Sequence, residues 1–181
     1  MDCCSTKPQN QIPGDIAEAL SKEPADTPAP QEALRHHCRR CGTAGQPVAR
    51  KTVLLMLLPE LLDRAGEADY RFCPDPECPV VYFTLGNEAT FMTVDLRVRV
   101  GLKERVAPIP LCYCFGFTES DAREEMLATG TSSIPQRITE LIKQKMCACA
   151  ARNPSGSCCL GEVNRSIKRL TLELSELSQP V

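Results

Sequence analysis

The sequence predicts an α+β fold in which a small β-rich half precedes a half built from three helices. Three observations carry this prediction. Short segments of β-branched and aromatic residues, separated by turn residues, occupy the first half. Apolar residues at helical spacing, bounded by capping residues, occupy the second half. Twelve cysteines in six close pairs are spread over both halves. A chain of 181 residues is long enough for one domain or two small ones.

Composition argues against two classes of partner and predicts a compartment. The formal net charge is -2, which gives no general reason to expect nucleic acid or an anionic membrane as a partner. The longest unbroken apolar run covers residues 53–58, far fewer than the ~20 that span a bilayer. The polar first residues, MDCCSTKPQNQIPGD, lack the apolar stretch of a signal peptide. We therefore expect a cytoplasmic protein with no membrane insertion.

The first half divides into an arm and a β-rich unit. Residues 1–33 are rich in Pro, Gln, Ala and charge, and we expect a disordered N-terminal arm. Residues 34–107 form the expected β-rich subdomain. Four elements are predicted in it: a short β segment at PVARKTV, a short helix at PELLDRAG, a strand at VVYFTL, and a half-buried strand over 91–103, where Val94, Leu96, Val98 and Val100 alternate with polar residues.

The second half, residues 108–181, is expected to be a helical subdomain. Thr118 is suited to cap a helix that Gly130 ends. A second helix is predicted over 134–146, where Ser133 and Gln136 have the spacing of a capping box. A third helix is predicted over 162–177, with one apolar face.

The pairing of the cysteines indicates metal binding. Stable disulfides are rare in the cytosol, so clustered thiols there more often bind a metal. Two ligands from one tight loop cost less ordering entropy than two from distant segments. Buried cysteines acting as small hydrophobic residues would account for one or two of these positions, but not for six pairs.

The first four paired thiols in this region predict a zinc site. They follow the pattern C-x2-C, 31 residues, C-x4-C, and each pair lies on a turn with Gly or Pro. Four thiolates from two such turns suit tetrahedral zinc in a structural role. The expected ligands are Cys38, Cys41, Cys73 and Cys78. His36 or His37 could replace one of them, but we expect both to be solvated loop residues.

The later cysteines predict a [2Fe–2S] cluster, which takes four cysteine ligands. Cys112 and Cys114 lie one residue apart, so in an extended segment both would face one way and bind one iron, or one iron each. Four further thiols then compete for two places. Two helix starts would face the negative cluster, and three rings would partly screen it: Tyr113, Phe115 and Phe117. A second zinc is the alternative, but its knuckles usually leave two or more residues between paired ligands.

Four motifs together resemble a known family. CRRCGTAGQPV, YRFCPDPECPVVYF, PLCYCFGFTESD and CACAARNPSGSCCLGEV are similar to the N-terminal domain of the CopZ-type copper chaperones, over residues 38–168. The helical half also resembles the cluster domain of bacterioferritin-associated ferredoxin. The resemblance implies Cys112 and Cys114 on the cluster and the four earlier cysteines on zinc. For the remaining ligands we favour Cys149 and Cys159, with Cys147 and Cys158 as alternates. The ferredoxin spacing would favour Cys147.

The resemblance implies a redox role in handling a soft metal, copper or mercury, and no enzymatic activity. The expected partners are a copper or mercury transport protein or an electron donor. The M-x-C-x-x-C motif of the family's copper-binding domain does not occur, so we expect the redox and zinc module alone. Cys3 and Cys4 are candidates for soft-metal transfer. The alternatives are a metal carrier without redox chemistry and a structural interaction module.

Overall fold

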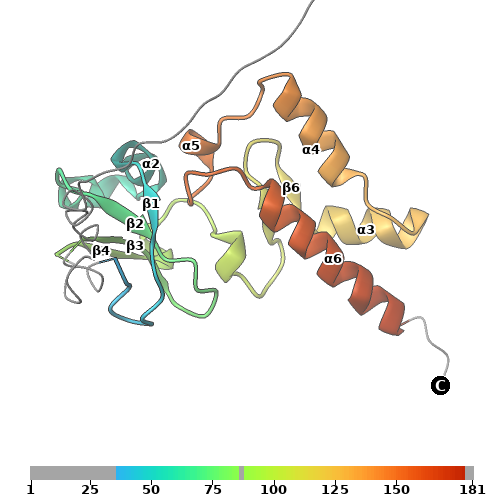
Figure 1. Cartoon of the computed structure of the whole chain (residues 1–181), viewed down its shortest axis with the longest axis horizontal. Helices are drawn as coiled ribbons and strands as arrows, with labels where there is room; N and C mark the ends of the chain where they lie inside the picture. Colours follow the sequence, from blue (N-terminus) through green and yellow to red (C-terminus); the bar gives the residue numbers. More distant parts are fainter. Residues whose placement is uncertain (1–35, 86–87, 178–181) are drawn as a thin grey trace, which may run out of the picture.

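The computed structural model describes residues 36–85 and 88–177 of the chain. The arm predicted over 1–33, with Cys3 and Cys4, lies outside these described residues. A sheet with helix α2 forms one end of the molecule, and α3, α4 and α6 form the other (Figure 1). The α+β prediction is confirmed, because strands dominate the first half and helices the second.

The first half is organised by a four-stranded antiparallel sheet in the order β1-β2-β3-β4. Its strands are β1 (Gln46–Val48), β2 (Tyr70–Phe72), β3 (Val80–Thr84) and β4 (Thr90–Met92). The central strand β3 is buried along its whole length, as its run of β-branched and aromatic residues predicts. Phe72 pairs with Gln46 on one side and with Tyr82 on the other.

Two expectations for the segment after β1 need adjustment. The β segment predicted at PVARKTV is confirmed only through Val48, because α2 (Arg50–Met56) follows at once. Thr52, Val53 and Met56 are buried, the spacing of a helix face. The short helix predicted at PELLDRAG is a 3₁₀ helix, η1 (Pro59–Arg64), with its proline in the first turn.

The strand predicted over 91–103 is confirmed only at Phe91 and Met92, where β4 ends. After β4 the chain turns through two 3₁₀ helices, η2 (Thr93–Asp95) and η3 (Gly101–Lys103). The Asp95 carboxylate accepts a hydrogen bond from the Met92 N–H at 2.7 Å, which closes the first turn. Val94 is therefore exposed, although Leu96 is buried and bridges to Leu57. A local side-chain hydrogen bond outweighs the alternating pattern here.

The second half begins with a hairpin of β5 (Pro110–Cys112) and β6 (Phe117–Thr118), which leads into the helices. The helices are α3 (Glu119–Thr129), α4 (Ile134–Lys143), α5 (Cys149–Arg152) and α6 (Leu160–Leu177). The three predicted helices are confirmed, but α4 ends three residues early and α6 begins two residues early. The four-residue helix α5 was not predicted.

The caps of α3 follow the prediction, whereas the cap of α4 does not. Thr118 and Asp121 form a capping box, and Gly130 ends α3 with φ 83°. Ser133 makes no side-chain cap on α4. The Glu125 carboxylate from α3 instead accepts hydrogen bonds from the Ser133 N–H and hydroxyl, at 3.0 and 2.5 Å. The predicted capping box at α4 is therefore replaced by a contact between helices.

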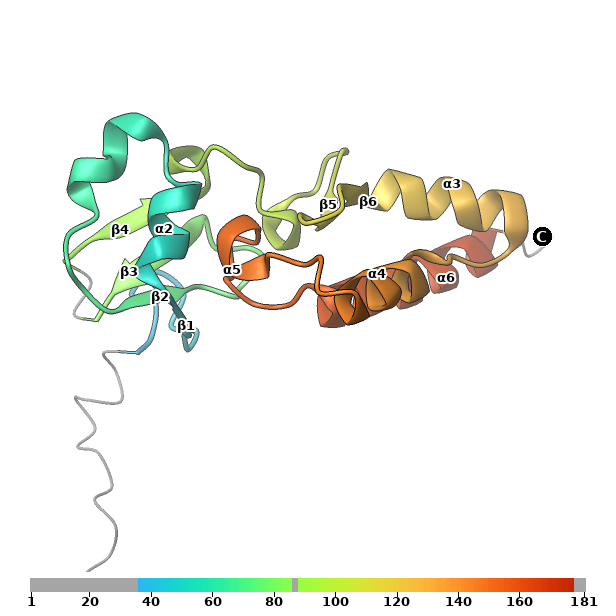
Figure 2. The same cartoon turned by 90° about the horizontal axis from the view of Figure 1, so that it is seen from above.

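Each half has its own hydrophobic core. The first lies between the sheet and α2, and the second lies between the β5–β6 hairpin, α3, α4 and α6. Seen from above, the two halves lie end to end, with α5 beside α2 where they meet (Figure 2). Among the described helices, none is long and apolar enough to cross a membrane.

Candidate metal centres

The first thiol pair lies on a tight turn that precedes the sheet. The Gly42 N–H donates to the Cys38 carbonyl at 2.7 Å, and the Cys38 N–H donates to the Thr43 carbonyl at 2.9 Å. Gly42 has φ 74°, a conformation that side chains other than glycine rarely adopt. The turn holds Cys38 and Cys41 on one side of the loop, as the C-x2-C spacing predicts.

The second thiol pair lies on the connection between β2 and β3. Asp75 organises this turn: its carboxylate accepts the Glu77 N–H at 2.9 Å, and its carbonyl accepts the Cys78 N–H at 3.3 Å. The Lys103 ammonium donates to the carbonyls of Asp75 and Cys78, at 2.6 and 2.9 Å. This cation ties the turn to η3 and places positive charge beside the thiols.

The structure brings these two turns together into one group of four sulfurs. The sulfurs of Cys38 and Cys78 are 3.9 Å apart, those of Cys41 and Cys73 are 3.6 Å apart, and all four lie within 4.8 Å of one another. A tetrahedral ion with bonds of about 2.3 Å would place its sulfur ligands about 3.8 Å apart. The four-cysteine group therefore fits Zn²⁺ in size and in donor type.

Burial makes this group depend on a cation. Cys38, Cys73 and Cys78 are buried, and burial raises the pKa values of Cys73 and Cys78 above the ordinary thiol value. A divalent ion offsets that penalty by stabilising the thiolates directly. No histidine belongs to the group among the described residues. His37 bridges to Ala44 through its backbone, and the buried Nδ1 of His36 has no hydrogen-bond partner within the described part of the chain.

A second group of sulfurs lies where the β5–β6 hairpin meets the beginning of α6. Cys112, buried at the end of β5, is hydrogen-bonded through sulfur to Cys159, and the sulfurs of Cys114 and Cys149 are 3.7 Å apart. The expected extended segment through Cys114 is wrong, because the chain turns after Cys112. The two cysteines of C-x-C therefore face different partners. Each forms a pair with one later cysteine.

Hydrogen bonds polarise both pairs. A hydrogen bond from Cys159 lowers the pKa of Cys112 to about 6 against the effect of burial, with help from the N–H groups of Phe115 and Cys114. The same contact and burial raise the pKa of Cys159. Burial and Cys114 raise the pKa of Cys149 to about 12. The Ala148 N–H donates to the Cys114 sulfur at 3.2 Å. These contacts favour negative charge on Cys112, whereas burial and the neighbouring thiols oppose it on Cys149 and Cys159.

The two pairs differ in their access to solvent. Cys112 and Cys159 are 1% and 4% exposed, whereas Cys114 and Cys149 are half-buried. The side of the site formed by the second pair therefore faces the surface. Cys147 and Cys158, the alternates, are both exposed, and no hydrogen bond between either sulfur and another cysteine is recorded within the described residues.

The rings around the C-x-C motif connect it to its surroundings. The Tyr113 hydroxyl accepts the Gly101 N–H at 2.7 Å and donates to the Arg99 carbonyl at 3.2 Å, and burial raises its pKa to about 12. Phe115 and Phe117 pack against the second core. That core includes Cys112 and Cys159, and the screening of a cluster by these rings stays a prediction.

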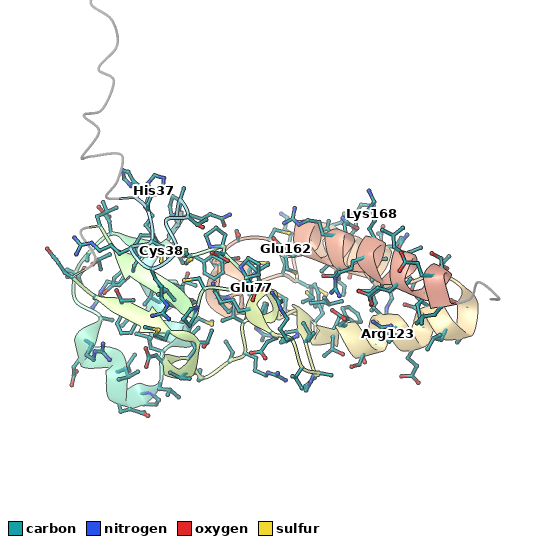
Figure 3. All side chains as sticks on the ribbon, turned by 90° about the horizontal axis from the view of Figure 1, so that it is seen from below. His37, Cys38, Glu77, Arg123, Glu162 and Lys168 are labelled. Carbon is teal, nitrogen blue, oxygen red and sulfur yellow. The ribbon has the colours of Figure 1, made fainter. Side chains whose placement is uncertain are left out.

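A cavity of about 830 Å³ separates the second zinc turn from the beginning of α6. Pro74 and Pro76 line one side, and Cys158, Glu162 and Arg165 line the other. Figure 3 shows Cys38 in the sheet-bearing half and Glu162 in the helical half, with Glu77 between them.

Two hydroxyl groups that the sequence did not predict as functional connect the two halves away from this cavity. The Thr52 hydroxyl bonds to Ala150, and the Tyr82 hydroxyl bonds to Pro154. The only sequence signal for these two residues was a hydroxyl-bearing side chain within a mainly apolar stretch.

Comparisons with known proteins point in one direction. A family model described as a zinc-binding domain, zf_CopZ, matches residues 35–97. The chain is 34% identical to a protein named copper chaperone CopZ from Archaeoglobus fulgidus, with 78% of this chain and 71% of that protein covered. The X-ray structure of the Archaeoglobus fulgidus CopZ N-terminal domain is similar with a TM-score of 0.57 and 31% identity. That match covers 80% of this chain and 99% of the other.

Proposed function

From the premise that the chain belongs to the CopZ family, we propose that it is a redox accessory protein in the handling of copper, holding zinc at one thiol group and a [2Fe–2S] cluster at the other. The observation that carries the proposal is the pairing of four cysteines from the hairpin and the α5–α6 region into two close pairs, one buried and one half-buried.

The zinc centre has a structural role in this proposal. Its four sulfurs lie close enough together for one tetrahedral ion, which leaves no open position for a substrate. Cys73 and Cys78 flank the connection into the central strand β3. Zinc therefore stabilises the separate small cluster that these cysteines form with Val80 and Phe83 of β3.

The second group fits a two-iron cluster better than a second zinc. Two sulfurs bind each iron of such a cluster, and the structure contains two separate pairs of sulfurs. The 3.7 Å separation of the Cys114 and Cys149 sulfurs matches the roughly 3.8 Å expected for two thiolates on one metal ion. We assign Cys112 with Cys159 to one iron, and Cys114 with Cys149 to the other.

When bound, the cluster would supply one-electron transfer. The chain would control the charge on its sulfur ligands and the access of water and of a redox partner. The Ala148 N–H stabilises negative charge on Cys114, while the rings of Phe115 and Phe117 limit access of water. The half-buried pair gives electrons a route to the surface. Reduction of copper to Cu(I) is the use that family membership favours, and mercury is a second soft-metal candidate. The partner is a metal-transport protein or an electron donor.

A specific spectroscopic experiment tests the redox role. Protein purified without oxygen is treated with dithionite, and its visible and paramagnetic resonance spectra are recorded before and after reoxidation. The proposal expects visible bands that bleach reversibly and a paramagnetic signal from one centre per chain. A cluster that does not cycle would instead support a structural interaction module. A colourless protein with two zinc ions and no iron would overturn the redox role.

A further inference from the structure

The last two thiols of the cluster site belong to a loop that rests on the other half of the molecule. We name residues 147–159 the cysteine loop. It leaves α4, forms α5 and returns to α6, and α5 packs against α2 of the sheet-bearing half (Figures 1 and 2). The zinc-binding half therefore contacts the loop that contains half of the proposed cluster ligands.

Two buried hydroxyls of the zinc-binding half hold the backbone of this loop. The Tyr82 hydroxyl donates to the Pro154 carbonyl at 2.7 Å, and the Thr52 hydroxyl donates to the Ala150 carbonyl at 2.7 Å. The Tyr82 and Thr52 side chains are each 0% exposed. One anchored carbonyl adjoins Cys149, and the other lies midway between Cys149 and Cys159. The two bonds thus fix the loop at α5 and at the turn over residues 153–156 that follows it.

The loop also fits closely against the surface that carries these hydroxyls. A Cβ atom at Gly156 would approach Val48 Cγ2 at 3.2 Å and Thr52 Oγ1 at 3.3 Å. Gly156 has φ 68°, so the chain turns tightly at this contact. The close approach leaves little freedom for the loop to shift while both hydrogen bonds remain.

The loop is stiff enough to transmit this anchoring to its cysteines. The Asn153 side chain donates to the Ser157 carbonyl at 2.7 Å and accepts the Ser155 N–H at 3.1 Å. The Asn153 N–H donates to the Cys149 carbonyl at 2.8 Å. Hydrogen bonds within residues 149–157 therefore hold this segment together. We expect a displacement of Pro154 to displace Cys149 as well.

We propose that Tyr82 and Thr52 are positioning residues for the second metal centre, which set the cysteine loop so that Cys149 and Cys159 meet Cys114 and Cys112. The proposal rests on the cluster assignment made above. It also links the two centres, because Tyr82 lies on β3, whose residue Val81 accepts the Cys73 N–H at 2.9 Å. Zinc loading in one half then supports retention of iron in the other.

The hydroxyl groups, rather than the volumes of these side chains, carry the effect. Tyr82→Phe and Thr52→Val keep nearly the same shape but leave the carbonyls of Pro154 and Ala150 without their donors. A carbonyl that loses its partner at a packed interface is destabilised, so the loop gains conformations in which that carbonyl reaches water. Cys149 and Cys159 then spend time away from their partners.

The experiment compares these two variants with matched controls in the same half. Tyr70→Phe removes a hydroxyl that donates to Gly66 at 3.2 Å, and Thr84→Val removes one that accepts the Ala89 N–H at 3.1 Å. Neither of these two hydrogen bonds involves a residue of the cysteine loop. Iron loss to a chelator and the visible circular dichroism of the cluster are measured well below the melting temperature. We expect iron loss about fivefold faster in Tyr82→Phe and in Thr52→Val, with altered dichroism, and unchanged values in the controls.

A second measurement separates this inference from the cluster assignment. In zinc-loaded protein without iron, alkylation of Cys149 is followed by mass spectrometry, with exposed Cys147 as the internal reference. Thr52→Val and Tyr82→Phe should speed alkylation of Cys149 about fivefold relative to Cys147. If wild-type protein never binds iron, the proposed function is overturned. The rate of Cys149 alkylation relative to Cys147 still tests whether Tyr82 and Thr52 position the loop. An unchanged ratio in both variants would overturn the inference.

Discussion

The sulfur of Cys114 lies 3.7 Å from the sulfur of Cys149, although 35 positions separate them in the chain. Cys112 lies in one buried cluster with Cys159, to which its sulfur is hydrogen-bonded. Four thiols are candidates for the last two cluster ligands, and the folded protein does not treat them alike: of these described residues, only Cys149 and Cys159 pair with the C-x-C motif. Cys147 and Cys158 are exposed, and their substitution leaves both pairs in place.

We predict that Cys149→Ala and Cys159→Ala shift or abolish the visible spectrum of the cluster, because each leaves an iron with an open position. Cys147→Ala and Cys158→Ala should leave the spectrum nearly intact and serve as matched controls. Iron content and absorbance of protein purified without oxygen provide the measurement. Loss of the spectrum in Cys147→Ala or Cys158→Ala would refute this ligand choice without refuting the cluster.

We predict that Cys73→Ala removes zinc, since Cys73 is fully buried within the four-sulfur group. The sheet-bearing half then loses more than about 3 kcal/mol of stability, because metal binding and folding are coupled. Iron colour should survive purification but fade faster than in wild type. Zinc content and chemical unfolding are measured, with Cys147→Ala as the control for loss of a thiol. Full zinc content in Cys73→Ala would disprove the zinc ligand assignment.

We predict that the reduced cluster reacts faster with an anionic oxidant at low salt than at high salt. Residues 105–118 and 141–161, which include all the proposed cluster ligands, contain no Asp or Glu. The Arg152 guanidinium donates to the Cys114 carbonyl at 3.1 Å, and exposed Lys145 lies three residues before Ala148, whose N–H donates to the Cys114 sulfur. Positive charge at the face around Cys114 attracts anions, and salt screens the attraction. Stopped-flow mixing with ferricyanide over a range of ionic strength gives the rates.

Charge reversal at this face provides the corresponding control. Lys145→Glu should react about twofold more slowly with ferricyanide at low salt. Lys168→Glu should not, because Lys168 points away from the molecule on α6 (Figure 3). Equal slowing by Lys168→Glu would mean that only net charge matters and that no particular face receives the oxidant.

We predict that Glu125→Gln destabilises the helical half by about 1 kcal/mol, the usual worth of a helix cap. Its carboxylate accepts hydrogen bonds from Ser132 and Ser133 at the beginning of α4. Hydrogen bonds from Ser133 lower the pKa of Glu125, so this stabilisation is complete at neutral pH and is lost as the pH falls through that lowered value. Chemical unfolding at neutral pH measures the effect. Glu124→Gln, at an exposed neighbouring residue, should change stability little.

The features that sequence analysis predicted correctly depend on neighbours in the chain. The capping box at Thr118, the glycine that ends α3 and the tight turn at Gly42 all arise within a few residues. Strand β3 could be recognised because burial on both faces requires a continuous apolar run. The four-sulfur group could likewise be recognised from spacing, because each of its two cysteine pairs lies on one tight turn.

The features that were missed depend on contacts between distant segments. The alternation over 91–103 suggested a strand, but a hydrogen bond from Met92 to Asp95 turned the chain. No local pattern indicates that Tyr82 reaches Pro154, 72 positions away, or that Glu125 replaces the expected cap on α4. The choice among the four late thiols likewise depends on the path of the cysteine loop, which the other half of the molecule supports.

The central claim is that one chain holds a zinc ion and a [2Fe–2S] cluster in two separate thiol groups. Iron, zinc and acid-labile sulfide content, measured on protein purified without oxygen, test it most directly. We predict two irons, two sulfides and one zinc per chain, together with the visible spectrum of a two-iron cluster. Two zinc ions per chain, with neither iron nor sulfide, would contradict the account.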